Sequence, residues 1–282
     1  MAVCGVCFRH CDIAEGRLGF CGGRISRKGR VEAYNYGRVT ALALDPIEKK
    51  PLARFFPGSM ILSTGSFGCN LRCPFCQNYD ISWSEQAGRY ADTAETVMPE
   101  ELVDIALKAR QKGNIGIAFT YNEPLIGYEF VRDTAKLAKE AGLKNVMVTN
   151  GTAELSVLQE LEPYIDAMNI DLKGFTDRYY GRVLGGDRGQ VMDFIRVAVK
   201  SCHVELTTLI VPGENDGENE MRELSGWVSG LENPDGESVP LHISRFFPRF
   251  RMRDREPTDV RTVYRLADIA REKLEYVYTG NC

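Results

Sequence analysis

From about residue 60 onward, short apolar runs alternate with amphipathic stretches of helical period. Such runs are typical of strands, and strands separated by helices predict βαβ units with a parallel sheet. Because six runs fall short of the eight strands that close a TIM barrel, we expect an α/β fold, a partial (β/α)6 TIM-like barrel of parallel strands. The expected strands are 60–65, 115–119, 145–149, 167–172, 204–211 and 241–246, and the expected helices include 129–140, 219–230 and 258–273.

Polar and turn-forming residues stand where the expected strands end. Cysteines follow the strand 60–65, the segment 120–124 (Thr-Tyr-Asn-Glu-Pro) follows the second strand, and Asn150 follows the third. Asp171 and Lys173 lie at the end of the fourth strand and share one of its faces, because side chains alternate along a strand. Functional side chains of parallel α/β folds collect at the carboxyl ends of strands, so we expect these residues to form one site.

Three cysteines with the spacing C-x3-C-x2-C follow the first expected strand. Three thiolates are one short of the four that close a structural zinc or iron–sulfur site. A metal group held by Cys69, Cys73 and Cys76 would therefore keep an open coordination position. The alternative is a zinc knuckle completed by a remote histidine, and the chain has only three histidines to supply it.

The first 58 residues lack the alternation of strands and helices and are poor in apolar residues. We therefore expect residues 1–58 to form a separate metal-stabilised, cysteine-rich N-terminal extension, and residues 59–282 to form the barrel. Four cysteines spaced C-x2-C-x3-C-x9-C match the count of a closed tetrahedral site, which either zinc or an auxiliary iron–sulfur cluster would fit. These cysteines are Cys4, Cys7, Cys11 and Cys21, with His10 as a substitute ligand.

Charge and targeting signals narrow the classes of partner. The chain has 282 residues, with 35 basic and 39 acidic side chains and a net charge of −4, which argues against a protein that binds nucleic acid through its overall field. The start of the chain lacks the apolar core of a signal peptide, and no stretch approaches the about 20 apolar residues of a membrane span. We therefore expect a cytoplasmic protein without membrane partners. In such a protein, clustered cysteines indicate metal binding and not disulfides.

The motif Cys69-x3-Cys73-x2-Cys76, with Phe75 before the last cysteine, resembles the signature of the radical SAM superfamily. The resemblance implies that the three cysteines hold a [4Fe–4S] cluster. It also implies that the amino and carboxylate groups of S-adenosylmethionine chelate the fourth iron, and that a 5′-deoxyadenosyl radical then abstracts hydrogen from a substrate.

The same resemblance assigns the other site residues to S-adenosylmethionine. Phe75 matches the position that packs near the adenine, and the segment 120–124 stands where the family has a GGEP-like motif that receives an ammonium group. Asn150, Asp171 and Lys173 match positions that contact the carboxylate and ribose. The residues with implied cofactor contacts are Phe75, Gln77, Asn78, Tyr121, Asn122, Glu123, Asn150, Asp171, Lys173 and His242.

Over its whole length, including DPIEKKPL (45–52) and HISRFFP (242–248), the chain resembles the radical SAM enzyme of the AmmeMemoRadiSam system, a relative of pyruvate formate-lyase activating enzymes. The resemblance implies a radical SAM oxidoreductase that modifies a protein or peptide, as a glycyl-radical activase does. Implied partners are an electron donor such as flavodoxin or ferredoxin, and AMMECR1-like and Memo-like proteins. Two alternatives remain: radical chemistry on a small molecule, and a non-catalytic, zinc-stabilised binding module.

Overall fold

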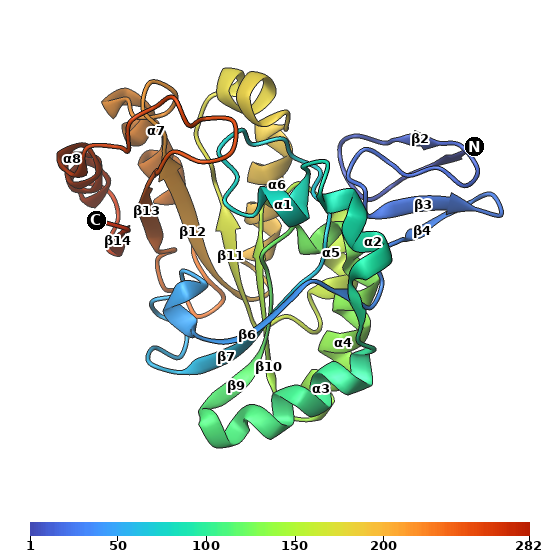
Figure 1. Ribbon diagram of the computed structural model, residues 1–282. Coiled ribbons are helices and arrows are strands. Elements are labelled where there is room, and N and C mark those ends of the chain that lie inside the picture. The colour runs from blue at the N-terminus through green and yellow to red at the C-terminus, as the bar shows by residue number, and fades with distance from the viewer.

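A curved central sheet with helices packed around it forms the body of the protein (Figure 1). The computed structural model describes residues 1–282, apart from the side chain of Ala91. Across the described residues the sheet has eight strands, in the spatial order β14-β13-β12-β11-β10-β9-β7-β6. These strands are β6 (Ala41–Pro46), β7 (Met60–Gly65), β9 (Asn114–Phe119), β10 (Lys144–Thr149), β11 (Ala167–Asp171), β12 (His203–Ile210), β13 (Leu241–Arg245) and β14 (Val277–Gly280).

Neighbouring strands from β7 to β14 pair in parallel, whereas β6 pairs antiparallel with β7 at the edge of the sheet. The six strands expected from the sequence are confirmed, as is the partial TIM-like barrel. The strands β6 and β14 extend the sheet beyond that expectation. Periodicity gave no signal for them, because β14 has only four residues and β6 lies in a segment without strand–helix alternation.

Amphipathic helices pack against the sheet between successive strands (Figure 1). In α4, for example, Phe130, Val131, Thr134, Ala135 and Ala138 are buried, and their spacing puts them on one stripe of the helix. The three expected helices named above correspond to α4, α7 and α8. The longer helices are α3 (Pro99–Lys108), α4 (Tyr128–Glu140), α5 (Leu155–Leu161), α6 (Arg188–Ala198), α7 (Glu218–Val228) and α8 (Val260–Arg271).

Short elements occupy the connections. Two single-turn helices, α1 and α2, follow the cysteine loop, and a short π-helix follows β11. Their bounds are α1 (Tyr79–Ser82), α2 (Tyr90–Thr93) and Tyr179–Leu184 for the π-helix, with 3-10 turns at Ile47–Lys49, Ala87–Arg89, Ala109–Lys112 and Pro124–Gly127. No helix among the described residues has the length and apolar character needed to cross a bilayer.

The N-terminal residues form small two-stranded sheets that project from one side of the barrel (blue in Figure 1). Several contacts hold them there; for example, buried Arg24 lies 2.6 Å from the carboxylate of Glu129 on α4, and the N–H of Cys69 donates to the carbonyl of Cys21 at 3.1 Å. The predicted division after residue 58 stays a prediction. The short strands are β1 (Ala2–Val3), β2 (Asp12–Ile13), β3 (Arg24–Arg27), β4 (Arg30–Ala33), β5 (Arg38–Val39) and β8 (Glu95–Thr96).

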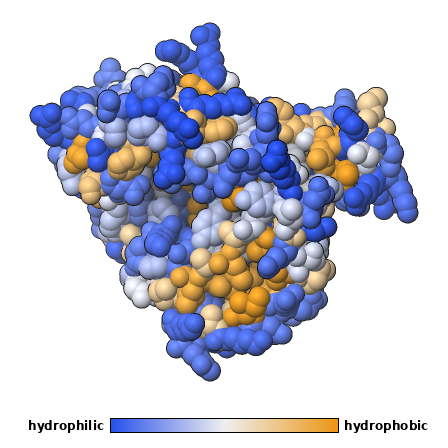
Figure 2. All heavy atoms as spheres, in the orientation of Figure 1, coloured by the Kyte–Doolittle hydropathy of each residue, from blue (hydrophilic) through white to orange (hydrophobic). Residues whose placement is uncertain are grey.

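The connection between β6 and β7 closes the end of the barrel where β7 begins. Ile47 and Leu52 are fully buried there, and they pack in a small cluster with Ile61 and Ala167 from the first residues of their strands. At the opposite end of the barrel, where the strands finish, the residues that follow the strands line a pocket. Figure 2 shows that apolar side chains also gather on the outer surface over β6, whose Leu42 is 41% exposed.

Candidate functional site

A pocket of about 290 Å³ opens at the carboxyl ends of the strands. It is lined by residues that follow or end β7, β9, β10, β11, β12 and β13. The structure brings every site residue predicted from the sequence to this pocket, except His242 and the four N-terminal cysteines. The lining residues from the prediction are Cys69, Cys73, Phe75, Cys76, Gln77, Asn78, Tyr121, Asn122, Glu123, Asn150, Asp171 and Lys173.

The cysteine loop is held by backbone contacts on both sides. The N–H of Gly68 donates to the carbonyl of Ile81 at 2.8 Å, and the N–H of Arg72 donates to the carbonyl of Leu184 at 2.8 Å. A turn within the loop is closed by the N–H of Cys76, which donates to the carbonyl of Cys73 at 3.2 Å. These contacts tie the loop to α1 and to the segment that ends at Leu184.

The three thiols of this loop lie in surroundings that oppose their ionisation. Burial raises the pKa of Cys73 to about 12 and raises the pKa values of Cys69 and Cys76 above their ordinary value. Thiolate forms under such conditions when a metal binds, because the cation compensates the buried charge. Three thiols on one loop, facing a pocket with carboxylate and amide groups, therefore fit an iron–sulfur cluster with one open position.

Glu123 follows β9, is buried in the pocket lining and joins two strand ends. Its Oε1 accepts hydrogen bonds from the N–H of Leu125 at 3.0 Å and from the hydroxyl of Thr149 at 2.6 Å, and its Oε2 accepts from the N–H of Asn150 at 2.8 Å. Burial raises the pKa of Glu123 to about 7, although these hydrogen bonds oppose the shift. A carboxylate offers about four acceptor positions, so one remains for a ligand donor.

Tyr121 has the backbone conformation that usually requires glycine, with φ of +71°. The side chain holds it there: its hydroxyl donates to Asp45 at 2.8 Å, and the ammonium of Lys50 lies 4.8 Å from the ring centroid. Lys50 is itself buried and lies 2.9 Å from Asp45. Sequence reasoning noted the segment 45–52 as part of a resemblance but did not connect it with Tyr121.

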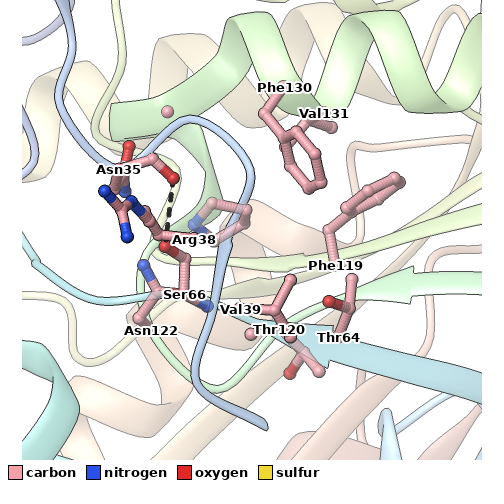
Figure 3. Close-up of a pocket in the computed structure, with 13 residues that line it drawn as sticks. Asn35, Arg38, Val39, Thr64, Ser66, Phe119, Thr120, Asn122, Phe130 and Val131 are labelled. Atoms are coloured by element: carbon pink, nitrogen blue, oxygen red, sulfur yellow. Dashed lines mark hydrogen bonds between the residues drawn. The ribbon is translucent and has the colours of Figure 1, made fainter. Parts of the chain in front are cut away.

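The amide of Asn122 lies beside Ser66, which precedes the cysteine loop (Figure 3). Its Oδ1 accepts from the N–H of Ser66 at 2.9 Å, and its Nδ2 donates to the carbonyl of Gly68 at 3.2 Å. The small cavity beside it, of about 30 Å³, has the rings of Phe119 and Phe130 on its other side. Asn122 thus braces the loop before Cys69, which is a positioning role in addition to its place in the pocket lining.

Asn150 connects Glu123 with the cysteine loop. Its Nδ2 donates to Oδ1 of Asn70 at 3.0 Å and lies 3.8 Å from the sulfur of Cys69. Asn70 is buried and donates to the hydroxyl of Thr152 at 2.8 Å. Sequence reasoning missed Asn70, although its position next to Cys69 was a signal that could have found it.

Asp171 and Lys173 form an ion pair at the end of β11, with 2.7 Å between the carboxylate and the ammonium. Burial opposes the charge of Lys173, but the attraction of Asp171 prevails and raises the pKa of Lys173 above its ordinary value. The alternation of β12 also puts Thr207 and Leu209 into the pocket lining, and Ser244 of β13 joins them. Strand alternation in 204–211 could have found the first two, yet they were not predicted.

His242 does not line the pocket. Its Nε2 lies 2.6 Å from the carboxylate of Glu205, which is also 3.0 Å from Nε2 of His203. Glu205 accepts the N–H groups of Ala53 and Arg54 as well, at 2.9 and 2.8 Å, so this cluster fastens the closed end of the barrel. The predicted contact of His242 with a cofactor stays a prediction.

The four N-terminal cysteines share one enclosed cavity of about 10 Å³, together with Arg9 and Arg24. Burial raises the pKa of Cys21 to about 12. Arg9 reaches from this cavity to the cysteine loop, where its Nε donates to the carbonyl of Asn70 at 2.7 Å. The second set of thiols is therefore assembled next to the first.

Comparisons with known proteins find similarity over the residues that form this pocket. The family profile described as "Radical SAM superfamily" matches residues 64–224, which contain the cysteine loop and the ends of β9, β10 and β11. An uncharacterized protein of Methanocaldococcus jannaschii, MJ0808, is 40% identical over 280 residues, which cover 99% of this chain and 80% of that protein.

Two further matches are more distant. The pyruvate formate-lyase-activating enzyme of Clostridium pasteurianum is 28% identical over 217 residues, which cover 74% of this chain and 89% of that enzyme. Among solved structures, Streptococcus suis SuiB bound to S-adenosylmethionine has a TM-score of 0.58 at 12% identity, and the match covers 76% of this chain and 48% of that one. At this identity the likeness to SuiB shows the fold alone.

Proposed function

The chain belongs to the radical SAM superfamily, and on that premise we propose that it cleaves S-adenosylmethionine reductively on a [4Fe–4S] cluster held by Cys69, Cys73 and Cys76. The bound cluster would supply the electron that splits the sulfonium C–S bond, and the 5′-deoxyadenosyl radical would abstract hydrogen from a substrate. The observation that most supports the proposal is the shared pocket, in which the three thiols face Glu123 and the polar ends of three strands.

The residues around the pocket suit the parts of S-adenosylmethionine. Glu123 would accept a hydrogen bond from its ammonium group at the one acceptor position that the protein leaves open. Asp171 would accept from the ribose hydroxyls, and Lys173 and Asn150 would donate to the carboxylate. Phe75 is buried at the pocket wall, where its ring would pack against the adenine.

The pocket also supplies shielding. Its walls include the apolar side chains of Leu71, Phe75, Val148 and Leu209. A carbon radical must be kept from accidental hydrogen donors, and an apolar wall helps because it excludes solvent and the donors dissolved in it. These residues would therefore protect the reaction, while the polar groups orient the reactants.

We propose that Cys4, Cys7, Cys11 and Cys21 hold a second metal site, either zinc or an auxiliary iron–sulfur cluster. The four thiols line one small cavity, which supports a shared site, although no three of the described cysteines are yet arranged to hold a single metal ion. The site would stabilise the N-terminal extension, residues 1–58, against the barrel of residues 59–282. The final strand of the extension, β6, is continuous with the barrel sheet.

The similarity to activating enzymes supports a protein or peptide as the substrate, modified as a glycyl-radical activase would modify it. We infer further that the chain acts in the AmmeMemoRadiSam system in the cytoplasm, with AMMECR1-like and Memo-like partners and an electron donor such as flavodoxin or ferredoxin. The net charge of −4 supports the expectation that nucleic acid is not a partner.

Metal analysis tests the first part of the proposal. Iron, acid-labile sulfide and zinc are measured per chain in anaerobically prepared protein, and the native sequence is compared with a variant in which Cys69, Cys73 and Cys76 are all alanine. We expect the variant to lose about four irons and four sulfides, and the metal that remains identifies the N-terminal site. Native protein that holds zinc without sulfide would refute the radical function and favour a zinc-stabilised binding module.

Isotope transfer tests the substrate class. Reduced enzyme is incubated with S-adenosylmethionine and candidate proteins deuterated at glycine, and 5′-deoxyadenosine is analysed for deuterium by mass spectrometry. Transfer from a protein supports the activase function. Transfer from a metabolite, without transfer from any protein, would instead establish chemistry on a small molecule.

A further inference from the structure

The loop after β13 and the turn after α1 form an exposed face rich in arginine and aromatic side chains. A hollow of about 520 Å³ lies on this face, lined in part by Phe247, Arg249 and Arg253. Arg249, Arg251 and Arg253 are exposed, and Phe247 is 39% exposed. The arginine–aromatic face consists of Trp83, Phe247, Arg249, Phe250, Arg251 and Arg253.

This face rests directly on the cysteine loop. The backbone N–H of Arg251 donates to the carbonyl of Pro74 at 2.9 Å, and the indole N–H of Trp83 donates to the carbonyl of Cys73 at 3.3 Å. One acceptor belongs to Cys73, the second cysteine of the loop, and the other belongs to Pro74, which follows it. A protein that docks on this face would therefore approach the cluster ligands through the loop that carries them.

The aromatic side chains order the face. Phe250 stacks on Tyr79 with 4.5 Å between ring centroids and 7° between ring planes, and Trp83 meets Phe250 edge-on at 4.7 Å. The guanidinium of Arg251 lies 4.7 Å from the ring centroid of Trp83. Phe250 has φ of +50°, a conformation that costs free energy in a non-glycine residue and that the stacking holds in place. The face is thus preorganised.

The charge on the face is uncompensated. Among the described residues, Arg249, Arg251 and Arg253 form no ion pair, whereas Arg255 of the same loop lies 2.7 Å from Glu214. Residues 249–256 contain four arginines against two acidic residues, although the whole chain is negative at −4. An exposed positive face on a negative protein steers and orients partners that carry negative charge.

We propose that the arginine–aromatic face docks an acidic one-electron carrier protein that reduces the cluster. This rests on the proposed function, which requires an external electron for each reductive cleavage. The carrier is oxidised by one electron and the cluster is reduced by one, with no bond formed or broken in the transfer. None of the six side chains belongs to the described lining of the active-site pocket, so a docked carrier leaves that pocket open to substrate.

The test uses the holoenzyme with photoreduced flavodoxin and, separately, photoreduced ferredoxin as acidic carriers. The triple variant R249E/R251E/R253E is compared with R17E/K28E/R30E, which changes the net charge equally at exposed residues of the N-terminal extension. Cluster reduction is followed by the loss of its visible absorbance in stopped flow. Dithionite, which needs no docking surface, serves as the second reductant, and iron content checks that the cluster is intact. The contact with Pro74 survives the substitutions because it uses backbone atoms.

We expect the face variant to lower the rate with at least one carrier by about 10-fold or more, and rising salt to lower the wild-type rate. The control variant and all rates with dithionite should stay within about twofold of wild type. The inference is wrong if the face variant keeps its rate with both carriers, if neither carrier reduces the wild-type cluster, or if dithionite reduction falls equally. A wild-type chain without any cluster would refute the proposed function as well.

Discussion

Glu205 offers a sharp test of how the closed end of the barrel is held. The carboxylate is fully buried and accepts four hydrogen bonds: from the N–H groups of Ala53 and Arg54, and from the rings of His203 and His242. Burial opposes its charge, yet these donors lower the pKa of Glu205 from 4.5 to about 2. One unit of pKa corresponds to about 1.4 kcal/mol. The fall in the pKa of Glu205 from 4.5 to about 2 therefore means that the folded site favours the carboxylate, relative to the unfolded chain in water, by about 3 kcal/mol.

The change Glu205→Gln replaces the carboxylate by a neutral group of the same shape, so we expect it to destabilise the protein by about 3 kcal/mol near pH 7. The measurement is urea unfolding of the holoenzyme by circular dichroism. The matched control is Glu237→Gln, because Glu237 also binds Arg54, at 3.0 Å, but on the surface. We expect about 1 kcal/mol or less from the control.

The pH dependence gives a second readout of the same group. The pKa of Glu205 is lower in the folded chain than in the unfolded chain, so its contribution is complete above about pH 4.5 and is lost as the pH falls toward 2. The difference between wild type and Glu205→Gln should shrink over that interval. A Glu205→Gln variant within about 1 kcal/mol of wild type at pH 7 would refute the argument from burial and hydrogen bonding.

Three further changes test the site and its supports. Gly68 has φ of +95°, and a Cβ there would lie 2.7 Å from a backbone carbonyl oxygen of the N-terminal extension, so Gly68→Ala should lower the iron content strongly. Gly58→Ala, at φ of +80° with open space, should cost only about 1 kcal/mol and keep the iron; equal iron in both variants would contradict the reasoning. Arg24→Met leaves the carboxylate of Glu129 on α4 unpaired, so it should lower the free energy of unfolding by about 3 kcal/mol and expose the extension to limited proteolysis. Arg27→Met removes an exposed ion pair and should change neither the stability nor the proteolysis. Asp171→Asn should weaken S-adenosylmethionine binding by about 10-fold in calorimetric titration, and unchanged affinity would remove Asp171 from the proposed contacts.

Local pattern was enough to predict the parts of the fold that depend on local periodicity. The strands of the partial barrel could be placed from apolar runs, because a strand buried by helices needs a continuous apolar segment of limited length. Alternation also predicted that Asp171 and Lys173 point the same way; both line the pocket, although β11 ends at Asp171 and Lys173 lies two residues beyond it. The rule that parallel strands present their carboxyl ends together then predicted one pocket from residues far apart in the chain.

Other features depend on which distant segments meet, and no local period encodes that. The partner of His242 is Glu205, which lies 37 residues earlier and also binds the segment that closes the barrel. The amide of Asn122 braces the cysteine loop, and the ring of Tyr121 is held by a buried ion pair from the segment 45–52. Spacing in the sequence determined which side chains could reach the carboxyl edge of the sheet. Only the packing of loops and of the N-terminal extension decided which of them face the pocket and which hold it together, because hydrogen-bond partners are chosen by proximity in space.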